Sequence, residues 1–314
     1  MSRGGRSLSV MSRPLSRLLP SHLPRLPSPS RLPRSLATAG GAAGILAGIL
    51  AGAPPAFADG KLEARYKLSL AGLELGRAAF LLEVDDGSYT ASGSARLTGV
   101  VQAVSSGKGS AGARGAVQRD GLMPRSFAME AETDRKAEAI RLSLAGGNVT
   151  DTKVEPPVPA AADRVPVSDK DKRGVLDPMT AALFLAPGSG DLMAPKNCER
   201  LLPIYDGRQR YDLDLSFERV DQVKAEKGYA GPALVCRISY KPVAGHRANR
   251  TSVKYMTRNK DMYVWLAPVA GTRVLAPFRA SVATAIGVAQ IEAVSFQTEP
   301  MVPKGGTPSR AAAP

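Results

Sequence analysis

The chain has 314 residues and a formal net charge of +14, but its basic residues are unevenly distributed. The first 58 residues contain seven arginines and no acidic residue; the remaining 256 carry 35 basic and 28 acidic residues, a net charge of +7. In this larger part basic and acidic residues alternate, as Lys224 and Lys227 do with Asp221 and Glu226, and no basic run is interleaved with aromatic residues. A nucleic-acid-binding protein is therefore not expected.

Residues 1–58 have the three parts of a secretory signal. A basic stretch rich in Pro and Ser precedes a small, apolar run from Leu36 to Ala53, and Ala56-Phe57-Ala58 then forms an A-x-A cleavage pattern ahead of Asp59. The sequence predicts export to the periplasm, cleavage at or near Asp59 and a soluble mature protein without a stable membrane span. The arginines of the basic stretch are Arg3, Arg6, Arg13, Arg17, Arg25, Arg31 and Arg34.

Other interpretations of this segment compete with a cleaved signal. A retained membrane anchor is one, because the apolar run is about as long as the shortest spanning helices, although five of its eighteen residues are glycine. A transit peptide would share the acid-free start but would need neither the apolar run nor the A-x-A pattern. A lipoprotein needs a cysteine at the cleavage site, and the first cysteine is Cys198. The basic stretch is unusually long, so Met11 is an alternative start.

Alternation of apolar and polar residues, which marks strands with one buried face, dominates the chain after Asp59. Turn residues separate the alternating runs, and Asp206-Gly207 between two of them is a strong hairpin signal. Short strands at this spacing predict a single all-β domain over residues 59–299, a curved antiparallel sheet or open β-barrel or clam, with a disordered tail over 300–314. The alternating runs are 62–70, 77–84, 89–97, 201–205, 208–217, 234–240, 262–266, 272–283 and 288–297.

One segment has the start and stop signals of a helix. Asp177 offers an N-cap, Pro178 stands at the first helical position, and Pro187-Gly188 end the run. The pattern predicts the main helix of the mature chain over residues 178–186. Because only Thr180 is polar in it, this short helix is expected to be buried against the concave side of the sheet.

The chain has two cysteines, Cys198 and Cys236. In an exported protein two cysteines favour one disulfide, which here would join the hairpin over 201–217 to the strand over 234–240. The alternative is a pair of separate buried thiols.

Several motifs of the C-terminal half resemble a family of exported bacterial proteins known only as domain of unknown function 3108. The resemblance spans residues 62–296 and implies a periplasmic, β-rich protein of unassigned function. The overall plan is also similar to open-barrel envelope proteins that carry lipoproteins or maintain the envelope, a likeness of fold that does not fix function. The motifs are Asp177-Pro178 through Leu183, Cys198, Leu202 to Arg208, Tyr211-Asp212, Cys236, Tyr240 to His246, Trp265 to Pro268, and Phe278-Arg279 to Phe296.

Side chains able to support catalysis are sparse after residue 58. His246 is the only histidine there, no G-x-S-x-G motif accompanies it, and one histidine with two cysteines falls short of a usual metal site. We expect neither a metal nor a cofactor, and we interpret His246 as a loop residue that hydrogen-bonds a neighbour. Trp265 is likewise expected to pack in the core or at the barrel rim.

A denser polar group lies at residues 206–212. Asp206 fits the hairpin turn, and alternation would place Arg208, Arg210 and Asp212 on one face of the following strand. An Arg-bearing face can bind a carboxylate or phosphate group, whereas more ordinary strand faces of this kind are solvated or carry ion pairs. Asp206, Arg208, Arg210 and His246 are therefore candidate ligand-binding residues.

Two classes of function remain. The first is a non-enzymatic protein that maintains the cell envelope by binding an apolar or lipid-like ligand or an envelope protein. The alternative is a periplasmic hydrolase that uses the His246 loop or paired carboxylates, whose spacing a sequence does not reveal. The first is preferred because no catalytic constellation is visible.

Overall fold

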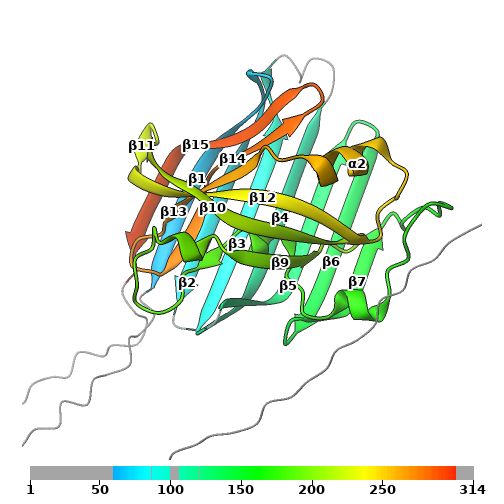
Figure 1. Cartoon of the computed structure of the whole chain (residues 1–314), viewed down its shortest axis with the longest axis horizontal. Coiled ribbons are helices and arrows are strands. Elements are labelled where there is room, and N and C mark those ends of the chain that lie inside the picture. The colour runs from blue at the N-terminus through cyan, green and yellow to red at the C-terminus, as the bar shows by residue number, and fades with distance from the viewer. Residues whose placement is uncertain (1–58, 86, 100–105, 120, 302–314) are drawn as a thin grey trace, which may run out of the picture. The chain divides into compact units, whose positions relative to one another are not determined.

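The structure, a computed structural model, describes residues 59–85, 87–99, 106–119 and 121–301. These residues form fifteen strands and two α-helices (Figure 1). The predicted leader and residues 302–314 of the predicted tail lie outside the described residues. The strands are β1 (Gly60–Leu70), β2 (Leu73–Asp85), β3 (Ser88–Leu97), β4 (Gly107–Gln118), β5 (Gly121–Thr133), β6 (Lys136–Ala145), β7 (Asn148–Glu155), β8 (Phe184–Leu185), β9 (Arg200–Tyr205), β10 (Arg210–Lys224), β11 (Lys227–Gly228), β12 (Ala230–Ala244), β13 (Met262–Pro268), β14 (Val274–Thr284) and β15 (Gly287–Pro300).

All the strands belong to one sheet whose main path runs β7-β6-β5-β4-β3-β2-β1-β15-β14-β13-β12-β10-β9. Neighbours on this path are antiparallel, and β7 and β9 end the path without pairing with each other, so the sheet is not closed. Away from the path, β8 pairs with β14 and the short β11 pairs in parallel with β15. The predicted fold class, an all-β chain with a curved antiparallel sheet, is confirmed.

The sheet folds over on itself: strands in the half that follows residue 200 cross in front of strands in the half that precedes residue 155. The two strands β10 and β12 have 15 residues each, and a bulge between Phe217 and Arg219 interrupts their pairing. Bulges of this kind bend a strand and increase its twist. The tip of the β10–β12 hairpin returns to β15, where Gly228 pairs with Phe296. Figure 1 shows β10 in yellow-green and β12 in yellow, crossing in front of the cyan and green strands.

Apolar side chains at alternate strand positions fill the space between the two halves. On β1, Leu62 is fully buried whereas its neighbour Glu63 is exposed. Leu62 belongs to a core cluster that also contains Trp265 of β13 and Phe278 of β14. Trp265 donates a hydrogen bond from Nε1 to Asp221 Oδ2 at 2.7 Å, which satisfies its polar atom. Trp265 is therefore a core residue, as expected.

The predicted helix over residues 178–186 is wrong in length. Helix α1 spans only Pro178–Ala181, with Asp177 as an N-cap whose side chain accepts hydrogen bonds from two backbone N–H groups. The chain then leaves the helix because Phe184–Leu185 pair with β14. The prediction of burial is correct, since Leu183, Phe184 and Leu185 are all buried.

A buried polar network fixes α1 between the two halves. Thr180 Oγ1 donates to Asp177 Oδ2 at 2.5 Å and is 2.6 Å from the Tyr89 hydroxyl of β3. Burial raises the pKa of the Asp177 carboxyl, while its three hydrogen bonds oppose that shift. Because α1 lies against β4, β5 and β9, it plugs the interior of the folded sheet.

The sequence did not predict the second helix, α2 (Thr251–Arg258), which is also longer than α1. None of its residues is buried, and its N-cap residue Arg250 makes no side-chain capping bond. The description of one short buried helix therefore holds for α1 alone.

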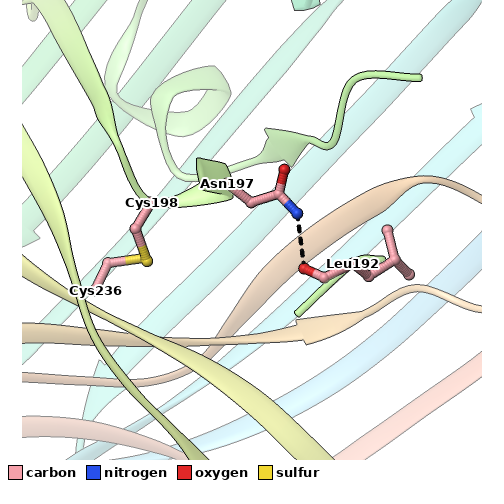
Figure 2. The surroundings of a disulfide bond; sticks show 4 residues. All are labelled: Leu192, Asn197, Cys198 and Cys236. Atoms are coloured by element: carbon pink, nitrogen blue, oxygen red, sulfur yellow. Dashed lines mark hydrogen bonds between the residues drawn. A yellow bond between two sulfur atoms is a disulfide. The ribbon is translucent and has the colours of Figure 1, made fainter. Parts of the chain in front are cut away.

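The predicted disulfide between Cys198 and Cys236 is present, with the two Cα atoms 5.4 Å apart. Figure 2 shows the bond between the two sulfur atoms, and both cysteines are fully buried. Cys198 precedes β9 and Cys236 lies in β12, so the bond ties the chain that enters the edge strand to the sheet interior. The neighbouring Asn197 donates from Nδ2 to the Leu192 carbonyl at 2.9 Å, which holds the approach to Cys198 in place.

Candidate functional site

The structure brings the predicted polar residues of two loops together. Arg210, at the start of β10, pairs with Ala244 at the end of β12. A Cβ atom added at Gly245 would lie only 2.1 Å from the Arg208 carbonyl oxygen. The β9–β10 turn, which holds Asp206 and Arg208, therefore adjoins the loop of His246.

Asp206 and Arg210 have structural roles in this cluster. Asp206 Oδ1 accepts hydrogen bonds from the backbone N–H groups of Arg208 and Gln209, at 2.8 and 2.7 Å. Burial raises the pKa of the Asp206 carboxyl, and these bonds oppose the shift. Arg210 Nη1 lies 2.6 Å from Asp212 Oδ1, so the two share a face as predicted. Arg208 is different: it lies in the turn, because β10 begins only at Arg210.

Arg208 and His246 retain unused polar atoms. Arg208 Nη2 is 3.8 Å from Glu138 Oε2, and its buried Nε and Nη2 make no hydrogen bond. His246 Nδ1 is also buried without a hydrogen-bond partner, while the His246 backbone carbonyl accepts from Val165 N at 3.0 Å. The predicted side-chain hydrogen bond of His246 is therefore not seen at Nδ1. Within the described ranges no group of three or more His, Cys, Asp or Glu side chains is arranged to hold a metal ion.

A second candidate site lies on the outer face of β1–β6, the face turned away from Leu62 and the core. A groove with a volume of about 1260 Å³ crosses these strands. Its floor consists of small side chains, with Ala79, Ser94 and Ser110 directly opposite one another on β2, β3 and β4. Longer side chains border this floor, and their height above it creates the groove. The charged residues that line the groove are Arg65, Arg77, Arg96, Lys108, Glu130, Glu132, Glu138 and Glu155.

Four basic residues form a continuous row beside this floor, which we call the basic ladder: Lys67, Arg77, Arg96 and Lys108. The sheet register places Lys67 opposite Arg77, Arg77 opposite Arg96, and Arg96 opposite Lys108. The ladder ends at acidic residues on both sides, because Lys67 also pairs with Glu292 and Lys108 also pairs with Glu132. Like charges directly opposite one another on a sheet are destabilising.

The ladder is only partly neutralised. Arg77 Nε lies 2.9 Å from Glu74 Oε1, and this hydrogen bond lowers the pKa of the Glu74 carboxyl. Lys108 Nζ lies 3.0 Å from Glu132 Oε2. Neither Lys67 nor Arg96 makes an ion pair with any residue that the structure describes. The outer face of β1–β4 therefore presents unpaired cationic groups beside a small-residue floor.

Comparison with known proteins places the chain in a family. A family model described as "Protein of unknown function (DUF3108)" matches residues 65–294. The chain belongs to the DUF3108 family. The predicted resemblance is thus confirmed, and it leaves the activity of this DUF3108 protein unassigned. A search of curated proteins finds no match.

Among solved structures, the DUF3108 chain is similar to the crystal structure of a β-barrel-like protein of domain of unknown function DUF1849 from Brucella abortus. The two share 11% sequence identity with a TM-score of 0.43, and the match covers 78% of this chain and 99% of the other. No helix within the described part of the DUF3108 chain is long and apolar enough to cross a membrane.

Sequence reasoning missed the basic ladder of the DUF3108 protein. Its members are 10 to 19 residues apart in the sequence, so they form no visible cluster. Only the register of β1 to β4 aligns them. The available signal was weak: each basic residue occupies a solvent-facing position of a strand, where basic residues are common.

Proposed function

We propose that this protein is a non-enzymatic component of the cell envelope that binds an amphiphile with an anionic head group in the outer groove. One observation carries this proposal: the basic ladder runs along a groove whose floor is small and uncharged. The ladder would hold the anionic group, and the floor would accommodate apolar chains.

Electrostatics supports an anionic ligand. Four adjacent cations repel one another, and a bound phosphate or carboxylate would relieve that repulsion. Arginine side chains also suit such groups because their N–H donors match two oxygens at once. Arg96, which lines the groove and has no ion pair among the described residues, is the donor best placed for this role.

The shape of the groove supports an elongated ligand. A volume of about 1260 Å³ exceeds that of most small-molecule sites, which measure about 300–1,000 Å³. Ala79, Ser94 and Ser110 leave the floor low across three strands. A ligand lying across the strands would thus contact the floor over its length and the ladder along its side.

The proposal includes export, supported by the signal-like leader that ends at Ala58. The mature protein is expected to begin at or near Asp59. N-terminal sequencing of the protein recovered from the envelope fraction measures this directly. Full-length protein found intact in the cytoplasm would contradict it.

Ligand binding is tested with a fluorescent phosphatidylglycerol analogue. We expect saturable binding, and a loss of about tenfold or more in affinity for Ser94→Trp, which fills the floor, and for Arg96→Glu, which removes charged donors. Thr90→Trp is the matched control, since Thr90 is exposed on the same face of β3 but does not line the groove. Equal binding by wild type and Ser94→Trp would contradict the proposal.

The hydrolase alternative rests on the unpaired Nδ1 of His246 near the Asp206 turn. His246→Ala and Asp206→Asn are introduced into a deletion strain, and envelope integrity is measured beside Ser94→Trp. The binding proposal expects His246→Ala to be tolerated. If His246→Ala alone abolishes function in a folded protein, the catalytic alternative is favoured instead.

A further inference from the structure

We propose that the tips of two neighbouring hairpins dock this protein on the surface of an anionic membrane. The docking surface consists of Leu73, Ile286 and Val288, which we call the apolar tip patch, together with Arg77 and Arg96 of the basic ladder. The inference rests on the proposed location in the envelope but not on the groove holding a ligand.

The apolar tip patch joins two hairpins. Leu73 follows the β1–β2 turn, Ile286 lies in the β14–β15 turn, and Val288 is the second residue of β15. These side chains are 64%, 73% and 46% exposed, respectively. The backbone N–H of Ala71 donates to the Val288 carbonyl at 2.9 Å, so the two turns are in contact. Figure 1 shows the blue β1–β2 tip beside the orange β14–β15 tip.

Such a patch differs from ordinary surface hydrophobics, which are scattered singly. Hairpin turns in water favour polar residues and glycine. Here three large apolar side chains lie in or directly beside the two touching turns, although Gly72 and Gly287 supply the required backbone conformations. Grouped exposed apolar side chains mark sites of contact with proteins or membranes.

The basic ladder adjoins this patch directly. Leu73, Arg77 and Arg96 line one shallow hollow of about 580 Å³, together with Glu74, Thr98 and Gly99. Arg77 follows Leu73 by four residues, a separation of about 13 Å along a strand. Glu74 is the one acidic side chain of the hollow, and Arg77 neutralises it.

This arrangement matches the layers of a membrane surface. Apolar groups of a surface-bound protein enter about 5–10 Å into the boundary between head groups and acyl chains. With the tips inserted to that depth, Arg77 and Arg96 would lie at the level of the lipid phosphates, where long basic side chains interact favourably. A second copy of the chain is the less favourable occupant, since a symmetric contact through the tips would bring two basic ladders together.

The test uses flotation with vesicles of phosphatidylethanolamine and phosphatidylglycerol, and with vesicles of phosphatidylcholine alone. Processed protein from the envelope fraction is expected to bind the anionic vesicles and to bind the neutral ones at least about fivefold more weakly. The double variant Leu73→Ser/Ile286→Ser should lose about tenfold in binding. Arg96→Gln should lose about fivefold, the usual effect of one basic residue at an anionic surface.

Two controls separate this inference from its alternatives. Val220→Ser/Val243→Ser removes two exposed apolar side chains elsewhere and should bind vesicles like wild type. Ser94→Trp should also bind vesicles normally, even though it is expected to lose the fluorescent lipid. Failure of wild type to float with anionic vesicles would overturn the inference, as would a concentration-dependent dimer that Leu73→Ser/Ile286→Ser dissociates. If Ser94→Trp loses only the fluorescent lipid and still floats with anionic vesicles, the groove and the docking surface act separately, as the inference expects.

Discussion

Replacing Leu183 with Asp is expected to destabilise the protein by at least about 4 kcal/mol. Leu183 is 6% exposed and belongs to the core cluster that joins the two halves of the sheet. It lies two residues after α1, where the interior polar groups already hydrogen-bond one another. A carboxylate at this position would be buried without a partner. Because natural domains are stable by about 5–15 kcal/mol, this change would remove a large share of the stability and, at the lower end of that range, leave the folded state only marginally favoured.

Urea denaturation followed by circular dichroism measures this loss. Leu201→Asp is the matched control, because Leu201 is 53% exposed and the same change there should cost about 0.5 kcal/mol or less. Leu183→Ala separates lost packing from buried charge and should cost about 2–5 kcal/mol. Melting of Leu183→Asp at nearly the wild-type temperature would show that the α1 segment is not part of the core.

Strands were predictable because one of their faces is buried. The alternation of residues 62–70 predicts a strand with one buried face, and β1 has buried and exposed residues in alternation over most of its length. The turn at Asp206 was predictable for a local reason, since its side chain satisfies two backbone N–H groups within the turn. Because these contacts join residues two and three positions apart, this turn does not depend on distant parts of the chain.

The two helices show what neighbouring residues in the sequence do not predict. Residues after α1 are apolar on every side, and such a run fits a buried strand as well as a buried helix. This run forms a strand and not a helix because Phe184–Leu185 gain backbone hydrogen bonds by pairing with β14. Helix α2 lacks both a buried side and a capping side chain, so neither of the usual signals was present.

The candidate sites depend on pairings between distant segments. The adjacency of Arg208 and Gly245 arises from the register of β10 and β12. The basic ladder arises from the register of four strands, and a shift of one residue would turn a basic side chain to the opposite face. Sequence patterns set which face of a strand is buried, but the turns and the packed core set which residues stand opposite each other.

Removal of the disulfide is the second change with a large expected effect. The double variant Cys198→Ala/Cys236→Ala should lose about 4 kcal/mol of stability, because the bond closes a loop of 38 residues in the unfolded chain. Reduction of the wild-type protein should have a similar effect, because it removes the same restraint on the unfolded chain. Urea denaturation with and without reductant measures both changes.

The slope of the urea transition identifies the cause of the loss. If the disulfide acts by restraining the unfolded chain, its removal should increase the slope, because the unfolded chain then exposes more surface. A defect in the native core, such as Leu183→Asp, should leave the slope unchanged and shift only the midpoint. Reductant should not affect the double variant, which has no cysteine. A double variant as stable as wild type would show that packing around Cys198 and Cys236 holds β9 to β12 without the bond.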